Sequence, residues 1–247
     1  LGDSEQNDII KIRKPVAISR ESLLLAHDAK YVDGFLEERL SEKEMRRIGL
    51  KPWTSKMIER TLCLTGGALE ATIHAIESKG ITGNMAGGTH HAHRSFGSGY
   101  CVFNDLAISA LYAIEKLGIE RVAVLDLDVH QGDGTATILS EEKRALTISV
   151  HCEKNFPFRK SVSDHDLPIE SLAGDELYLE TVREALEICL EFEPQLVLYQ
   201  AGVDGLETDS LGKLNVTRNG MRKRNQYVFE IMLANKIPTV IFMGGGY

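Results

Sequence analysis

Apolar runs typical of buried strands alternate along this chain with stretches in which apolar residues recur at helical spacing. The runs predict strands over residues 121–125, 145–150, 195–200 and 238–243, with a weaker candidate at 16–19. The helical spacing predicts helices over residues 55–79, 105–117, 173–192 and 219–236, with a short helix after Gly134. Such alternation is typical of parallel strands joined by helical crossovers.

The pattern therefore predicts an α/β fold with a central parallel sheet and helices on both of its faces. We find no linker, internal repeat or low-complexity segment in the sequence. A single domain over residues 1–247 is thus the prediction, with two domains of half that size as the alternative.

The stretch LDLDVHQGDG places acids and a histidine directly after a strand that is apolar on both faces. If the extended conformation persists there, Asp126, Asp128 and His130 point to one side and the residues between them to the other. Burying two neighbouring carboxylates is costly unless a cation neutralises them. This spacing indicates a metal site, with Asp128 and His130 as natural ligands.

Polar residues gather at three further predicted strand ends, which meet at one edge of a parallel sheet and commonly bind ligands there. AGGTHHAHRSFGSGYC holds His90, His91 and His93; YQAGVDGLETDSLG holds Asp204; and IFMGGGY ends on Tyr247. Taken alone, a histidine pair in a glycine-rich loop or an aspartate after a strand is typical of a solvated turn. The four strand ends together favour a ligand-binding or catalytic site.

Asp204 supplies a third ligand beside Asp128 and His130, and three protein ligands with an open position are common in zinc hydrolases. Because no thiolate takes part, Fe²⁺ and Co²⁺ are alternatives to Zn²⁺. His90 and His91 then serve as proton carriers. Asp126 and Asp133 are the acids that could orient them, and different partners would give the two imidazoles different pKa values.

Charge and cysteine content narrow the function class further. The net charge of −8 argues against a nucleic-acid-binding surface. The four cysteines lie far apart without a CxxC pair, which favours free thiols in a reducing compartment, so we expect a cytoplasmic protein. No apolar run reaches the ~18 residues of a membrane span, and no membrane partner is expected.

Five motifs, in this order, resemble the histone deacetylase superfamily: GGTHHAH…GSGYCVFND, VLDLDVHQGDGT, ISVH, AGVDGLETDSLGKLNVT and GGGY. The similarity runs from about His27 to Tyr247. Gln131, where many members have a second histidine, and the stretch NFPFRKSVSDHDL resemble class IV and bacterial-type members. The resemblance implies an arginase/deacetylase-like fold and zinc-dependent removal of acetyl or longer acyl groups from lysine side chains or related amines.

The resemblance also assigns roles to the polar residues. It makes Asp128, His130 and Asp204 the zinc ligands. His91, paired with Asp133, becomes the general base, and His90, paired with Asp126, becomes its electrostatic partner or proton donor. The Tyr247 hydroxyl would polarise the scissile carbonyl. The resemblance also implies a narrow tunnel for the acyl-lysine stem, lined by Gly99, Tyr100, Phe156 and Leu211.

The resemblance further implies a structural K⁺ near Ser149 and the backbone of residues 126–130. Because the family continues beyond the GGGY motif, we expect the chain to be incomplete at both ends. The expected partners are an acyl-lysine protein or peptide, or a small acylated amine such as an acetylpolyamine, and the oligomeric state is left open.

Two rival functions remain. An arginase-type ureohydrolase has a related fold, but its two-metal site would need more ligands than Asp128, His130 and Asp204 provide. A binding module without turnover would be expected to lack His91 or Tyr247, and both are present.

Overall fold

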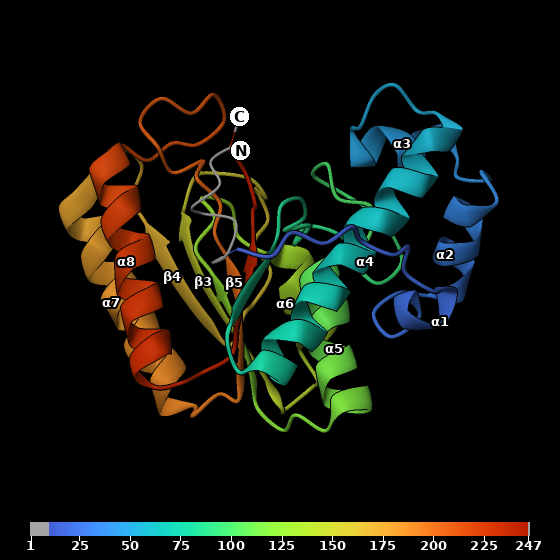
Figure 1. The fold of residues 1–247 in the computed structure, drawn as a ribbon. Coiled ribbons are helices and arrows are strands. Elements are labelled where there is room, and N and C mark those ends of the chain that lie inside the picture. The colour runs from blue at the N-terminus through green and yellow to red at the C-terminus, as the bar shows by residue number, and fades with distance from the viewer. Residues whose placement is uncertain (1–9, 247) are drawn as a thin grey trace.

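A computed structural model describes residues 10–246 and shows a six-stranded sheet in which every strand pair is parallel. The strand order is β1-β6-β5-β2-β3-β4. The strands are β1 (Ile81–Asn84), β2 (Val122–Asp126), β3 (Ala145–Cys152), β4 (His165–Ile169), β5 (Leu196–Gln200) and β6 (Thr239–Phe242). Figure 1 shows them side by side in the middle of the molecule, so the predicted single α/β domain with a parallel sheet is confirmed.

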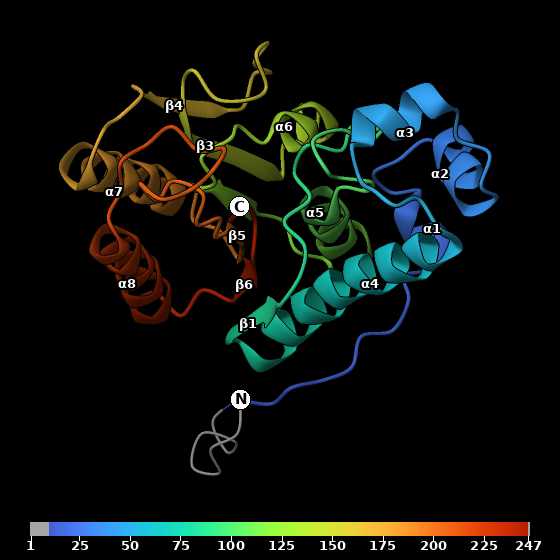
Figure 2. The ribbon, with the colours of Figure 1, turned by 90° about the horizontal axis from the view of Figure 1, so that it is seen from above.

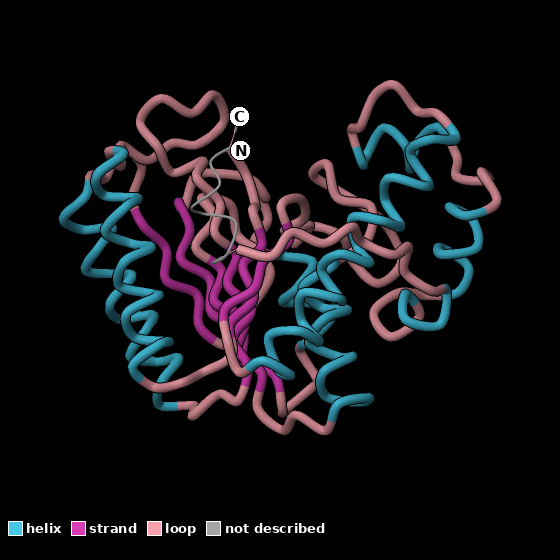
Figure 3. Tube along the Cα trace, viewed as in Figure 1, coloured by secondary structure: helices cyan, strands magenta, loops and turns pink. Residues whose placement is uncertain are grey.

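Helices cover both faces of this sheet, as predicted (Figure 3). Their bounds are α1 (Arg20–Leu23), α2 (Ala29–Leu36), α3 (Glu42–Ile48), α4 (Ser55–Ser78), α5 (Asp105–Leu117), α6 (Asp133–Leu139), α7 (Asp175–Glu191) and α8 (Arg218–Ala234). Helices α7 and α8 pack on one face, and α4 and α5 lie on the other (Figure 2). In residues 10–246, none of the helices combines the length and the apolar character that crossing a bilayer requires.

The alternation of side chains along the central strands divides the core into two layers. In β2, Val122 and Val124 belong to the cluster under α4 and α5, whereas Ala123 and Leu125 belong to the cluster under α7. All four are at most 1% exposed. A strand that is apolar on both faces is therefore held between two helical layers, which is what its unbroken apolar run predicted.

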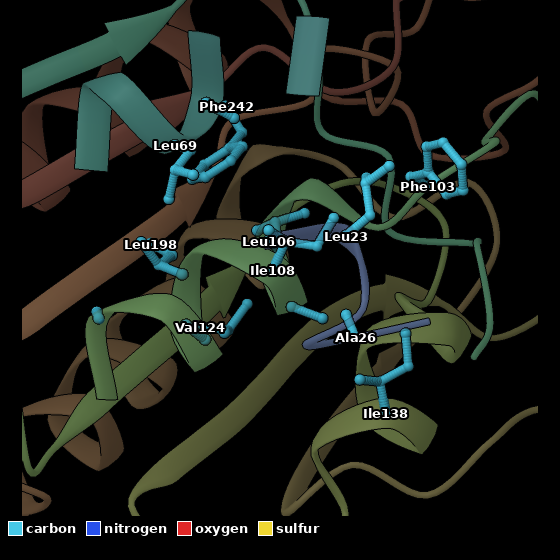
Figure 4. Close-up of a cluster of buried hydrophobic side chains, with 14 of the residues drawn as sticks. Leu23, Ala26, Leu69, Phe103, Leu106, Ile108, Val124, Ile138, Leu198 and Phe242 are labelled. Carbon is cyan, nitrogen blue, oxygen red and sulfur yellow. The ribbon is translucent and has the colours of Figure 1, made fainter. Parts of the chain in front are cut away.

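Leu106 lies in the centre of the first layer, on the buried face of α5 (Figure 4). It has no exposed surface, so truncation would leave a cavity among side chains that cannot all close in. Leu106→Ala is expected to lower the free energy of unfolding by about 2–5 kcal/mol. Urea denaturation followed by circular dichroism measures this. Leu233→Ala on α8, where the leucine is 62% exposed, is the matched control and should change stability by less than about 0.5 kcal/mol.

The ends of α5 follow from local sequence and match the prediction residue for residue. The Asn104 side chain accepts the N–H of Ala107 at 2.9 Å, which satisfies a free donor of the first turn. Gly118 ends the helix in the left-handed conformation, with φ of 69°. Both signals act within a few residues.

The strand predicted at 16–19 is wrong, because this segment packs against α4 instead of joining the sheet. Ile18 donates its N–H to the carbonyl of Leu62, and a Cβ on Gly66 would lie 1.9 Å from the Val16 oxygen. Glycine is therefore required where the segment crosses the helix. Helices α1–α3 and strands β1 and β4 were not predicted.

Candidate active site

The carboxyl ends of the central strands bring the polar stretches together at one edge of the sheet. Asp126, the last residue of β2, pairs in register with Gln200, the last residue of β5. Gln200 in turn pairs with Phe242, at the end of β6. The stretches after β2, β5 and β6 therefore start side by side, and the loops above the sheet in Figure 1 include them.

The chain bends after Asp126, where the sequence suggested a continuing strand. Asp128 donates its N–H to Oδ1 of Asp126 at 3.1 Å, and His130 donates its N–H to Oδ1 of Asp128 at 3.0 Å. Leu127 and Val129 are buried in the layer under α7. The expected separation of polar and apolar side chains is thus present, but it is produced by turns whose N–H groups are bound by aspartate side chains.

Asp128, His130 and Asp204 form a cluster in which one potential ligand atom from each lies within 4.8 Å of the others. Nδ1 of His130 is 3.1 Å from Oδ1 of Asp128 and 3.1 Å from Oδ2 of Asp204. The remaining carboxylate oxygens accept backbone N–H groups, from Val129 on Asp204 and from Gly245 on Asp128. These backbone donors hold both carboxylates toward the imidazole.

The electrostatics of this cluster suit a cation. Burial and the nearby charge of Asp128 raise the pKa of Asp204 to about 7. Against the effect of burial, His90 and His130 hold the pKa of Asp128 below its ordinary value. Two buried carboxylates therefore repel each other, and a divalent ion between them would remove that repulsion. The donor set of two oxygens and one nitrogen fits Zn²⁺ as well as Fe²⁺ or Co²⁺.

His90 and His91 are each held by a separate buried aspartate. Nδ1 of His90 lies 2.7 Å from Oδ2 of Asp126, and Nδ1 of His91 lies 2.7 Å from Oδ1 of Asp133. Each imidazole thus donates its Nδ1 proton to its aspartate. Nε2 is the ring nitrogen that takes no part in this hydrogen bond. The two rings have centroids 4.0 Å apart.

The two histidines nevertheless have opposite pKa shifts. Burial lowers the pKa of His90, but the charges of Asp126 and Asp128 outweigh it and raise the value to about 10. Burial and the positive charge of His90 lower the pKa of His91 to about 4. At neutral pH, His90 is therefore cationic and His91 neutral, so His91 alone can accept a proton.

A second set of side chains, not singled out from the sequence, holds the histidine loop. Asp105 accepts N–H groups from Gly88 and Thr89 at 2.9 and 2.7 Å. The Asn104 amide donates to the carbonyls of His90 and Ala92 at 3.2 and 3.0 Å. Asn104 and Asp105 belong to the FND sequence at the start of α5. Besides capping the helix, this sequence holds the backbone of the histidine loop.

His27 ties the same loop to α5 and accounts for an expected pH dependence. Its Nδ1 donates to the His93 carbonyl at 3.0 Å, and its Nε2 accepts the Asn104 N–H at 2.9 Å. Burial lowers its pKa to about 4. The folded state keeps His27 neutral while the unfolded chain takes up a proton below pH 6.5.

The free energy of unfolding is therefore expected to fall as the pH drops from 6.5 to about 4, with up to about 3 kcal/mol from His27. His27→Gln removes this proton uptake and should make the slope less steep across that window, with the remainder coming from His91 and His151, whose pKa values are also lowered to about 4. Denaturant titrations at several pH values measure the slope. An equally steep slope in the variant would contradict the assignment.

An open pocket of about 510 Å³ leads to the histidines and the acidic cluster. His91 and His130 line it, together with the four predicted tunnel residues Gly99, Tyr100, Phe156 and Leu211. Phe156 packs edge-on against His91, with ring centroids 4.8 Å apart. Gly99 has φ of 52°, and a Cβ there would lie 2.7 Å from Cδ2 of His91. The backbone can approach the histidine this closely because the residue is glycine.

Two further side chains at this edge were missed. Asn155, buried beside His130, accepts the Lys213 N–H and donates to the Leu211 carbonyl, so it joins two segments of the pocket wall. Arg224 of α8 is fully buried and donates to the carbonyls of Gly202 and Ala201 at 2.5 and 3.0 Å. Arg224 lies three residues after Met221 and four before Val228, so helical spacing places it on the buried face, and this signal was overlooked.

The remaining predicted residues are placed as follows. Ser149, expected near a K⁺ ion, pairs its Oγ with Nδ1 of His151 at 3.0 Å. Gln131 is fully buried, donates to Asp166 and the Ser161 carbonyl, and accepts the Ser161 N–H. It therefore fixes the loop after β3. Tyr247 lies outside the described residues.

Comparison with known proteins adds a family match. The family model described as the histone deacetylase domain matches residues 2–247. An uncharacterized protein of Picosynechococcus sp. is 42% identical over 239 residues, covering 96% of this chain and 79% of that protein. Histone deacetylase 2 of Arabidopsis thaliana is 29% identical and is covered over 63% of its length, against 96% of this chain.

A solved structure gives the same picture for the fold. The crystal structure of an HDAC homolog complexed with SAHA superposes with a TM-score of 0.82 at 26% sequence identity. The match covers 98% of this chain and 70% of that chain.

Proposed function

Because this chain belongs to the histone deacetylase family and is a deacetylase-type hydrolase, we propose that it removes acyl groups from lysine side chains at the pocket described above. The observation that carries the proposal is the position of two unlike histidines beside a buried cluster of potential metal ligands. His91 and His130 line the pocket, His90 lies beside His91, and Asp128 and Asp204 lie beside His130.

Asp128, His130 and Asp204 are the residues that would hold the metal, for which we propose Zn²⁺. A bound divalent ion would lower the pKa of a water molecule and polarise the carbonyl of the substrate amide. Fe²⁺ and Co²⁺ suit the same donor set, so the identity of the ion is part of the proposal.

His91 is the proposed general base. Its neutral imidazole, held through Nδ1 by Asp133, can take the proton of the attacking water at Nε2. His90 remains cationic and stabilises the negative charge that develops on the carbonyl oxygen. The protonated His91 then supplies the proton that the leaving amine needs. The Tyr247 hydroxyl is proposed to donate to the carbonyl oxygen.

The pocket walls would hold the substrate stem. Gly99, Tyr100, Phe156 and Leu211 offer the mostly apolar lining that an acyl-lysine chain requires. We also propose that a structural K⁺ binds near Ser149 and that the chain belongs to the class IV branch. A reducing compartment such as the cytoplasm is the proposed location.

The ureohydrolase alternative is less well supported. Among residues 10–246, the only group of three acids or histidines with the spacing of metal ligands is Asp128, His130 and Asp204. A two-metal centre needs further ligands that bridge the two ions.

The direct test is an assay of purified protein on acetyl-lysine and myristoyl-lysine peptides, on an acetylpolyamine and on arginine, with and without a chelator. We expect chelator-sensitive release of the acyl group from lysine. Urea production from arginine, or lysine deacylation that a chelator does not affect, would contradict the proposal.

A further inference from the structure

The pocket mouth carries positive charge on a protein that is acidic overall. Arg47 and Lys213 line the pocket, and none of the described lining residues is an aspartate or glutamate. The whole chain has 28 lysines and arginines against 36 aspartates and glutamates. The sign of the charge is thus reversed at the mouth.

Both cations are exposed, and neither forms a salt bridge with a carboxylate of the described residues, although Arg47 and Glu44, both on α3, attract each other. The Arg47 guanidinium lies over the Phe96 ring, 4.4 Å from its centroid. Lys213 donates from Nζ to the Lys154 carbonyl at 2.8 Å. These contacts fix the side chains and leave their charges available.

The segments that contribute lining residues extend the same charge. Residues 46–51 and 154–160 contain no acid, and their basic residues are Arg46, Arg47, Lys51, Lys154, Arg159 and Lys160. Of these, Arg46 pairs with Glu42 and Lys160 donates to backbone carbonyls. Asp209, in the lining segment 209–213, accepts the N–H groups of Leu211 and Gly212. The excess at the mouth is therefore positive.

The two ends of the pocket would contact different parts of the substrate. Under the proposed function, the scissile carbonyl lies against His91 and His130, so the acyl group is inside the pocket. The exposed cations then face the part of the substrate that carries the leaving amine.

We propose, on the basis of that function, that the preferred substrate is an acyl-lysine flanked by aspartate or glutamate residues in a peptide segment. Carboxylates beside the lysine would face Arg47 and Lys213 and gain attraction during both encounter and binding. Lysine-rich flanks and cationic polyamines would meet like charge. Pairs at an exposed rim have modest individual effects, so the expected preference is about three- to tenfold.

Three acetyl-lysine peptides of equal length, with aspartate, glycine or lysine on both sides, test this preference. At low salt, kcat/KM is expected to be highest for the acidic peptide and lowest for the basic one. The ratio should approach one near 1 M salt, where the screening length is ~3 Å. An N-acetylpolyamine is expected to be a poorer substrate than the acidic peptide.

Charge reversal identifies the residues responsible. Arg47→Glu and Lys213→Glu should each lower the acidic-to-basic ratio, and the double variant should reverse it. Lys223→Glu on α8, on the opposite side of the sheet from α3 (Figure 1), makes the same charge change and should leave the ratio unaltered. The salt dependence of the wild-type ratio tests the proposal even if a variant fails to fold.

Equal kcat/KM for the acidic and basic peptides, a preference for the basic peptide, or efficient turnover of the polyamine would overturn the substrate proposal while leaving the deacetylase proposal intact. Failure to turn over any of the three peptides would count against both.

Discussion

Replacing His91 with alanine is expected to lower kcat/KM for an acetyl-lysine peptide by about 10⁴-fold or more, at the upper end of the effect of losing a general base. Of the neighbouring His90 and His91, His91 is the one whose pKa lies well below neutrality, because it is buried and adjoins the cationic His90. No other described imidazole shares both its position in the pocket wall and its hydrogen bond to Asp133. The attacking water would therefore lose its base.

His90→Ala should leave more activity and change the pH profile in a defined direction. Removing the positive charge beside His91 raises the pKa of His91 toward 6.5, so the acid limb of kcat/KM should move to higher pH. His165→Ala, at an exposed position on the edge strand β4, is the control. If His90→Ala proves far more damaging than His91→Ala, the two roles must be exchanged.

The second large effect is expected at Asp204. Asp204→Ala should abolish both metal binding and turnover, because it removes one of the three potential ligands and one of the two negative charges that would attract the ion. Tyr247→Phe should retain the metal and lose most turnover, since the family resemblance assigns the Tyr247 hydroxyl to the carbonyl rather than to the metal. Metal analysis of the purified variants together with kcat/KM separates these outcomes. Equal metal loss in both would contradict the division of roles.

Sequence patterns predicted the central sheet and the long helices because their signals are local and repeated. The apolar run before Asp126 requires cover on both faces, and the Asn104 and Gly118 signals fix both ends of α5. Strand β4 was missed because only Ile169 of its five residues is buried and it contains Pro168, which an edge position tolerates. Helices α1–α3 are too short for a clear periodicity. In α3 the Ser41–Glu44 capping box and Gly49 at the C-terminal end are local signals that were overlooked.

The site was predictable as far as residue types at strand ends reveal it. Asp128 and His130 were proposed as ligands because charged residues directly after a strand that is apolar on both faces need a partner, and Asp204 was added because it follows another strand end. The three residues do cluster in the structure. Asn155 was not predicted, because its partners are a backbone carbonyl and an N–H group distant in sequence, which leave no pattern. Arg224 was overlooked although it shares helical spacing with the buried Met221 and Val228. The opposite pKa shifts of His90 and His91 also depend on burial and on which aspartate each histidine meets.

The central claim is that a metal held by Asp128, His130 and Asp204 is required for deacylation. The most direct measurement is kcat/KM for an acetyl-lysine peptide as Zn²⁺ is added back to chelator-treated protein, with Asp204→Ala in parallel. We expect activity to be absent at first, to rise until about one equivalent is bound, and to stay at baseline in the variant. Full activity in the metal-free protein, or the same titration curve for Asp204→Ala, would contradict the account.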